Sequence, residues 1–213
     1  MFPDKNLSNI RALIAEGEGQ QLDFKYHIGS APKIAKTLVA FANTDGGRLL
    51  IGVKDNGNII GVESEEEVFM IELAAEQYCK PHVQVNLIDH HLDGKTVLEV
   101  YVGVSEEKPH YAKDETGKWL VFVRRKDENL LANAVLIDVL KNKKDKRETI
   151  VRYQEPEQIL LSHLEKHKKI TFTQFCKLAY IPPHVAQRVL VNLASIDMIE
   201  IHITPQENFF TLK

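Results

Sequence analysis

The stretch from Ala40 to Val62 restricts the fold of this chain more than any other. It reads AFANTDGGRLLIGVKDNGNIIGV and follows an apolar helical pattern over 34–43. Gly46 and Gly47 supply the backbone freedom that a tight exit from this helix requires. A buried strand is predicted over 49–53, and the turn at 55–58 favours a hairpin that returns over 59–62.

The elements around this stretch indicate an α+β fold with a mixed sheet. Helices are expected at 6–16 and 65–78, and strands at 22–25, near 83–90, at 95–102 and at 119–124, followed by a helix at 129–141. Strands and helices do not alternate regularly along the chain, so a doubly wound parallel sheet is not expected.

The C-terminal part has a different pattern. Helices are predicted at 155–166, 171–180 and 183–196, with Thr171 as an N-cap, and a β-hairpin is predicted over 198–212. Three helices and a terminal hairpin are typical of a winged helix-turn-helix domain. The expected organisation is therefore a first domain at 1–145, a linker at 146–153 and a winged-helix domain at 154–213.

Composition and charge limit the classes of function. The net charge of −3 argues against indiscriminate binding to polyanions. Residues 1–145 contain 18 cationic and 23 acidic side chains, whereas residues 146–213 contain 9 and 7. A cationic run at 141–147 can steer a phosphate backbone, or it is a solvated helix end.

Cysteine content and hydropathy bear on location. Two distant cysteines favour a reducing cytosol over a disulfide framework, and no apolar stretch approaches the roughly 18–20 residues of a transmembrane helix. The N-terminus has no apolar segment of signal-peptide type. We therefore expect a cytoplasmic protein that does not enter a membrane.

Four stretches resemble the Schlafen/AlbA-type family of DNA-binding domains. They are EGQQLDFK from Glu18, AFANTDGGRLLIGV from Ala40, DNGNIIGV from Asp55, and KPHY from Lys108 with FVRR after it. The resemblance implies a nucleic-acid-binding fold. Bacterial members that carry a C-terminal winged helix are usually regarded as transcriptional regulators, so DNA is the expected partner, with RNA as the alternative and a homodimer as the assembly considered.

The resemblance also suggests a catalytic alternative. Animal Schlafen relatives include RNA endonucleases with three acidic residues, which match Glu18, Asp23 and Asp55 here. Such a trio would bind Mg²⁺ or Mn²⁺ and activate water for phosphodiester cleavage. The sequence departs from the pattern with Asp at position 23. The structural alternative is that Asp23 lies on the solvent face of a strand and Asp55 opens a turn.

Nucleic-acid contacts are predicted in both domains. Arginine and lysine side chains can pair with phosphates, and Gln, Arg and Asn can read base edges. In the first domain the predicted contacts are Lys25, Asn43, Arg48, Arg124, Arg125 and Lys126. In the second they are Lys168, Lys169, His184, Gln187, Arg188 and Asn192, the last four on the predicted recognition helix. Tyr111 is a candidate for stacking on a base.

Three hypotheses remain open from the sequence. The first is a DNA-binding transcriptional regulator, the second is a metal-dependent endoribonuclease, and the third is a protein-interaction module without a nucleic-acid role. The acidic first domain is the main support for the third.

Overall fold

The computed structural model describes residues 10–62, 64–144 and 154–213, which form two compact units that divide between Leu131 and Ala132. The sequence placed a domain boundary at 145, after the helix that the structure groups with the second unit. The predicted linker at 146–153, the cationic run beyond Lys144 and the start of the first predicted helix lie outside the described residues.

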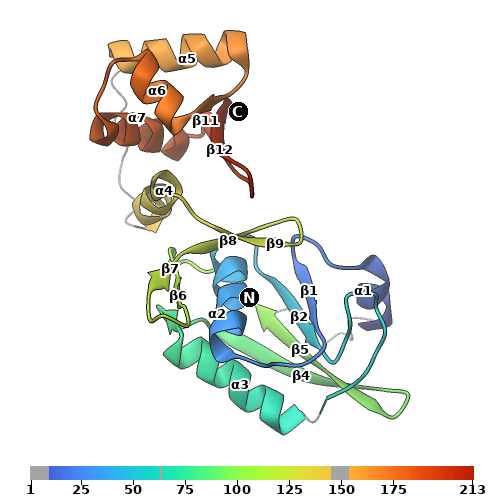
Figure 1. The fold of residues 1–213 in the computed structure, drawn as a ribbon. Helices are drawn as coiled ribbons and strands as arrows, with labels where there is room; N and C mark the ends of the chain where they lie inside the picture. The colour runs from blue at the N-terminus through green and yellow to red at the C-terminus, as the bar shows by residue number, and fades with distance from the viewer. Residues whose placement is uncertain (1–9, 63, 145–153) are drawn as a thin grey trace. The chain divides into compact units, whose positions relative to one another are not determined.

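The first unit is built on a mixed four-stranded sheet, as the sequence predicts (Figure 1). The strand order is β1-β2-β5-β4, in which β1 and β2 are parallel and the other pairs are antiparallel. The strands are β1 (Leu22–Lys25), β2 (Gly47–Ile51), β4 (Val85–Leu92) and β5 (Lys95–Val102). The helices of this unit are α1 (Ile10–Glu16), α2 (Ala31–Asn43) and α3 (Ser64–Gln77).

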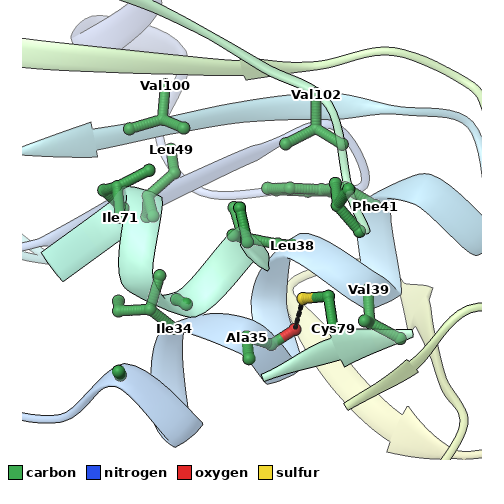
Figure 2. Packing of buried hydrophobic residues seen from close by; sticks show 14 of the residues in the cluster. Ile34, Ala35, Leu38, Val39, Phe41, Leu49, Ile71, Cys79, Val100 and Val102 are labelled. Atoms are coloured by element: carbon green, nitrogen blue, oxygen red, sulfur yellow. Dashed lines mark hydrogen bonds between the residues drawn. The ribbon is translucent and has the colours of Figure 1, made fainter. Parts of the chain in front are cut away.

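A hydrophobic cluster packs on each face of this sheet. On one face, α2 and α3 pack against Leu49, Val100 and Val102 to form the larger core, which Figure 2 shows. On the other face, Ile10 of α1 joins a smaller cluster that includes Phe24. Period-two alternation in β1, β2 and β5 therefore supplies apolar side chains to both layers.

Two small sheets complete the first unit. β3 (Cys79–Lys80), β6 (Tyr111–Lys113) and β7 (Trp119–Leu120) pair in the order β3-β6-β7, and β8 (Phe122–Arg125) pairs with β9 (Glu128–Leu131). The prediction of a helix that begins at 129 is wrong for Leu130 and Leu131, which pair with β8. Apolar spacing within one segment carries no information about pairing with β8, a few residues upstream.

The second unit contains four helices and an antiparallel sheet among its described residues. Its helices are α4 (Ala134–Lys144), α5 (Glu155–His167), α6 (Phe172–Leu178) and α7 (Pro183–Ser195). Its strands are β10 (Ile170–Thr171), β11 (Ile199–Ile203) and β12 (Asn208–Leu212), in the order β10-β12-β11. The predicted cap is confirmed, because Thr171 and Gln174 form a capping box at the start of α6.

The turn after α2 requires glycine at two positions, Gly46 and Gly47. Gly46 has a φ of +69°, and a Cβ there would lie 2.7 Å from the carbonyl oxygen of Val102. A Cβ on Gly47 would lie 2.5 Å from the ring of Phe41. Both contacts are closer than packed atoms tolerate, so glycine is required at each position for steric reasons.

We predict that Gly46→Ala destabilises the protein by about 1–3 kcal/mol more than Gly94→Ala. Gly94 also has a positive φ, of +74°, but nothing lies within 4 Å of its would-be Cβ. The pair therefore separates steric overlap from backbone strain. Urea unfolding of the two variants measures the difference, and equal losses would contradict the account of Gly46.

Candidate nucleic-acid interface

Arg124 lies inside the first unit and not on its surface. Its side chain is 1% exposed. Nε donates to the Gly19 carbonyl at 3.1 Å, and Nη1 donates to Asn129 Oδ1 at 3.0 Å. Nη2 donates to the Leu22 carbonyl at 3.0 Å and to Asp23 Oδ1 at 3.2 Å. The predicted phosphate contact at Arg124 is therefore wrong, since its donors already bind groups of the protein.

Asp23 is the buried partner of this arginine. Its residue is 3% exposed, and its second oxygen lies 2.9 Å from Lys25 Nζ. Lys25 also donates to the Phe24 carbonyl at 2.7 Å. The expectation that Asp23 lies on the solvent face of a strand is wrong, because this face packs beneath Arg124. The Lys25 ammonium is directed to groups of its own strand.

Glu18 lies beside this pair and is only partly buried. Its Oε1 accepts the Phe24 backbone N–H at 2.9 Å. Burial raises the pKa of the Glu18 carboxyl above its ordinary value, and the neighbouring Asp23 carboxyl adds to this effect, while the Phe24 N–H and Lys25 oppose it. Two of the three predicted metal ligands, Glu18 and Asp23, are therefore neighbours in the structure.

Asp55, the third predicted metal ligand, comes from a different segment. It lies exposed in the turn after Val53. In the part of the chain that the structure describes, no group of three or more His, Cys, Asp or Glu side chains is arranged to hold a metal ion. One of the three predicted ligands, Asp23, is already paired with Arg124.

Asn43 is also a structural residue. It is 4% exposed at the end of α2. Its amide nitrogen donates to the carbonyls of His110 and Phe122, both at 2.9 Å, and its amide oxygen accepts the His110 N–H at 2.7 Å. These bonds use the side chain to join α2 to the segments around β6 and β8.

Arg48 belongs to a polar cluster on the sheet that the sequence did not reveal. It pairs with Glu99, which is fully buried and also lies 2.7 Å from His90 Nε2. The Arg48 guanidinium lies over the Tyr101 ring at 5.5 Å. These residues come from β2, β5 and β4, so only the strand register places them together. The arginine is partly exposed but already neutralised.

Arg125 and Lys126 are the predicted cations of the first unit that lie at the turn between β8 and β9. Lys126 is exposed and has a φ of +55°. Its backbone N–H donates to Gln20 Oε1 at 2.8 Å, which fixes the turn to the loop before β1. Arg125 is partly exposed and stands opposite Glu128 in the β8–β9 pair.

A pocket of about 580 Å³ lies near the C-terminal end of α2. Its lining includes His82 and His110 as well as Glu106 and Glu107. His110 is buried, with ring nitrogens 2.9 Å from the Pro81 carbonyl and 2.6 Å from Ser105 Oγ. The two glutamates make this pocket unsuited to a phosphate group.

In the second unit the predicted cations lie at two places. Lys168 and Lys169 are exposed between α5 and β10. Lys169 pairs with Glu207 of the β11–β12 turn at 2.7 Å and lies over the Phe209 ring at 5.1 Å. His184 and Arg188 are exposed on α7, one helical turn apart, and Asn192 is partly exposed on the next turn.

Gln187 of α7 is already bound within the second unit. Its amide donates to Asp138 of α4 at 2.6 Å, and α4 packs against α7. Val191, one turn further along α7, is only 6% exposed. Of the four polar residues predicted on this helix, His184 and Arg188 are therefore the most accessible.

Comparison with known proteins identifies the first unit. The family described as Schlafen, AlbA_2 matches residues 18–133. No curated protein matches the chain. Among solved structures, this chain is similar to the DIP2311 protein of Corynebacterium diphtheriae, with 20% sequence identity and a TM-score of 0.45. The match covers 62% of this chain and 27% of that protein. The N-terminal domain of a RecG-related protein from Nitrosomonas europaea is 26% identical with a TM-score of 0.38, over 54% of this chain and 86% of that one.

The helices of the described ranges do not have the character of membrane spans. No helix there combines the length and the apolar character that crossing a bilayer demands.

We predict that Arg124→Met lowers the free energy of unfolding by about 3–5 kcal/mol, because it leaves the Asp23 carboxylate buried without its partner. Lys54→Met, at an exposed position, is the matched control and should change stability little. Thermal and urea unfolding measure both variants. A loss at Arg124 no greater than at Lys54 would show that the arginine does not hold the unit together.

Proposed function

We propose that this chain, which belongs to the Schlafen AlbA_2 family, binds nucleic acid and acts as a DNA-binding transcriptional regulator through a C-terminal winged helix. The family match supports nucleic-acid binding by the first unit. The order α5-β10-α6-α7-β11-β12 in the second unit supports the winged helix, in which α6 and α7 form the helix-turn-helix and β11 and β12 form the wing.

The observation that most favours duplex DNA is the exposed N-terminal half of α7. A recognition helix contacts base edges in the major groove through residues of its N-terminal half. His184 and Arg188 lie there with exposed side chains. Arginine can donate two parallel hydrogen bonds to guanine. Lys169, between α5 and β10, lies near the wing through its pair with Glu207 and is suited to the phosphate backbone.

The endoribonuclease alternative has less support. It depends on Glu18, Asp23 and Asp55 acting together, whereas Asp23 is already held by Arg124. The interaction-module alternative is favoured by the contact between α4 and α7, which already covers part of the proposed recognition helix.

We predict that Arg188→Ala weakens binding to a DNA duplex by roughly 5- to 150-fold, the range expected for one lost arginine–base contact. Arg11→Ala removes the same charge from an exposed ion pair with Asp93 in the first unit and is the matched control. Fluorescence anisotropy with a labelled duplex measures both variants. Equal affinities for the two variants would contradict a reading role for α7.

The contact between α4 and α7 gives a second test. We predict that Asp138→Ala increases duplex affinity roughly fivefold, because it removes a negative charge beside α7 and releases the Gln187 amide from one hydrogen bond. Asp138→Asn removes the charge but keeps an acceptor for Gln187, and should give a smaller gain. An unchanged or reduced affinity for Asp138→Ala would indicate that DNA does not approach this side of α7.

A further inference from the structure

The small β3-β6-β7 sheet has an outer face made of two lysines and two aromatic residues. Lys80 of β3 pairs with Tyr111 of β6, and Lys113 of β6 pairs with Trp119 of β7. Directly paired residues project to the same face of a sheet, and residues two apart on one strand share that face. The register therefore places all four side chains on one surface.

The opposite face of this sheet points into the core. Cys79 and Ala112 are each 1% exposed and pair with each other, and Leu120 pairs with Ala112. The face that carries Trp119 is consequently the solvent face. Trp119 is 41% exposed, and Lys80 beside β6 is also exposed. An accessible tryptophan among cations is a typical feature of a binding surface.

A groove between α2 and β6 carries further lysines. It has a volume of about 310 Å³ and is lined by Lys33 and Lys36 of α2 and by Lys113 of β6, with Phe122 among its apolar residues. Lys36 Nζ lies 5.0 Å from the centre of the Phe122 ring. The α2 helix packs against β6 on the side of Ala112, which also lines the groove, so Lys113 is the residue that the groove shares with the outer face.

Two acidic residues also line the groove, against its three lysines. Asp114 Oδ1 accepts the N–H groups of Thr116 and Lys118, at 2.9 and 2.8 Å, and the Thr116 hydroxyl at 2.8 Å. These bonds hold the β6–β7 turn and lower the pKa of the Asp114 carboxyl. Glu115 is the other acidic residue of the lining, at the exposed tip of the turn.

We infer that this surface, which we call the Trp119 platform (Lys80, Tyr111, Lys113 and Trp119), binds a single-stranded segment of nucleic acid. Aromatic side chains stack on unpaired bases, while lysines beside them follow the phosphates. The face of a base inside a duplex is covered by its neighbours, so an exposed tryptophan favours an unpaired strand. The inference rests on the proposed nucleic-acid-binding function and assigns a second surface, separate in sequence from α7.

The chain itself provides a specific probe of this surface. Trp119 is its single tryptophan. Stacking of a base on an indole quenches its fluorescence, so quenching reports contact at the platform directly. We expect oligo(dT) and oligo(U) to quench the emission in a saturable manner, and a blunt DNA duplex to leave it nearly unchanged. The two oligonucleotides distinguish DNA from RNA as the preferred strand.

Three variants test the assignment through affinity. In anisotropy with labelled oligo(dT), Trp119→Ala should weaken binding by roughly 5- to 150-fold, the range for one lost stacking contact. Lys113→Ala should also weaken it and reduce its salt dependence. Glu115→Gln should strengthen binding, because it removes a negative charge from the groove, and this gain cannot come from a failure to fold. Arg11→Ala is the control for charge.

The outcomes separate the two proposals. If duplex DNA binds but oligo(dT) and oligo(U) neither bind nor quench Trp119, the platform is overturned and the proposed DNA binding stands. If single strands bind without quenching and Trp119→Ala binds them normally, the strands bind elsewhere and the platform is again overturned. If single strands quench Trp119 while no duplex binds, the platform stands and the duplex-reading function fails. If neither the duplex nor the single strands bind, both proposals are overturned.

Discussion

The ion pair of Arg124 with Asp23, buried beside α2, is the interaction on which the first unit depends. The arginine projects from β8, yet its hydrogen bonds reach the Gly19 and Leu22 carbonyls, Asp23 of β1 and Asn129 of β9. Its guanidinium lies 5.2 Å from the centre of the Phe41 ring of α2. One side chain therefore joins the edge of the central sheet, its covering helix and the β8–β9 pair. A buried charge with four hydrogen bonds specifies this arrangement, because a shift of β8 would break bonds between polar groups in the core.

Several residues in the stretches that resemble the family have structural roles in this arrangement. Asn43, the two glycines after it and Arg124 are buried or sterically required, so they account for the fold of the domain. Any surface that meets nucleic acid must use side chains that remain accessible, such as those of Trp119 and Arg188 and the exposed lysines. The acidic composition of the first unit is consistent with local contact surfaces and not with a uniformly basic face.

Local patterns predicted most of the elements, and long-range partners decided the rest. The strands at 22–25 and 95–102 were predicted with the bounds that the structure gives, because alternation and flanking turns mark them clearly. The predicted hairpin over 59–62 is reduced to one bridge between Val53 and Ile59. For the site, the exposure of His184 and Arg188 followed from helical spacing. The burial of Arg124 could not be predicted, since its partners lie about a hundred residues earlier in the chain. The outer face around Trp119 was missed because it depends on the pairing of three two- or three-residue strands.

The most direct test of the account is a salt titration of the intact chain with a labelled DNA duplex and a labelled single strand. Contacts between exposed lysine or arginine side chains and phosphates release counterions, so affinity should fall linearly with salt concentration on a logarithmic scale. The account predicts such a slope for both nucleic acids, with full recovery of intact strands on a gel in the presence of Mn²⁺. Lack of binding to either nucleic acid at low salt would contradict it and would direct attention to partner proteins, whereas manganese-dependent cleavage would favour the nuclease in place of the regulator.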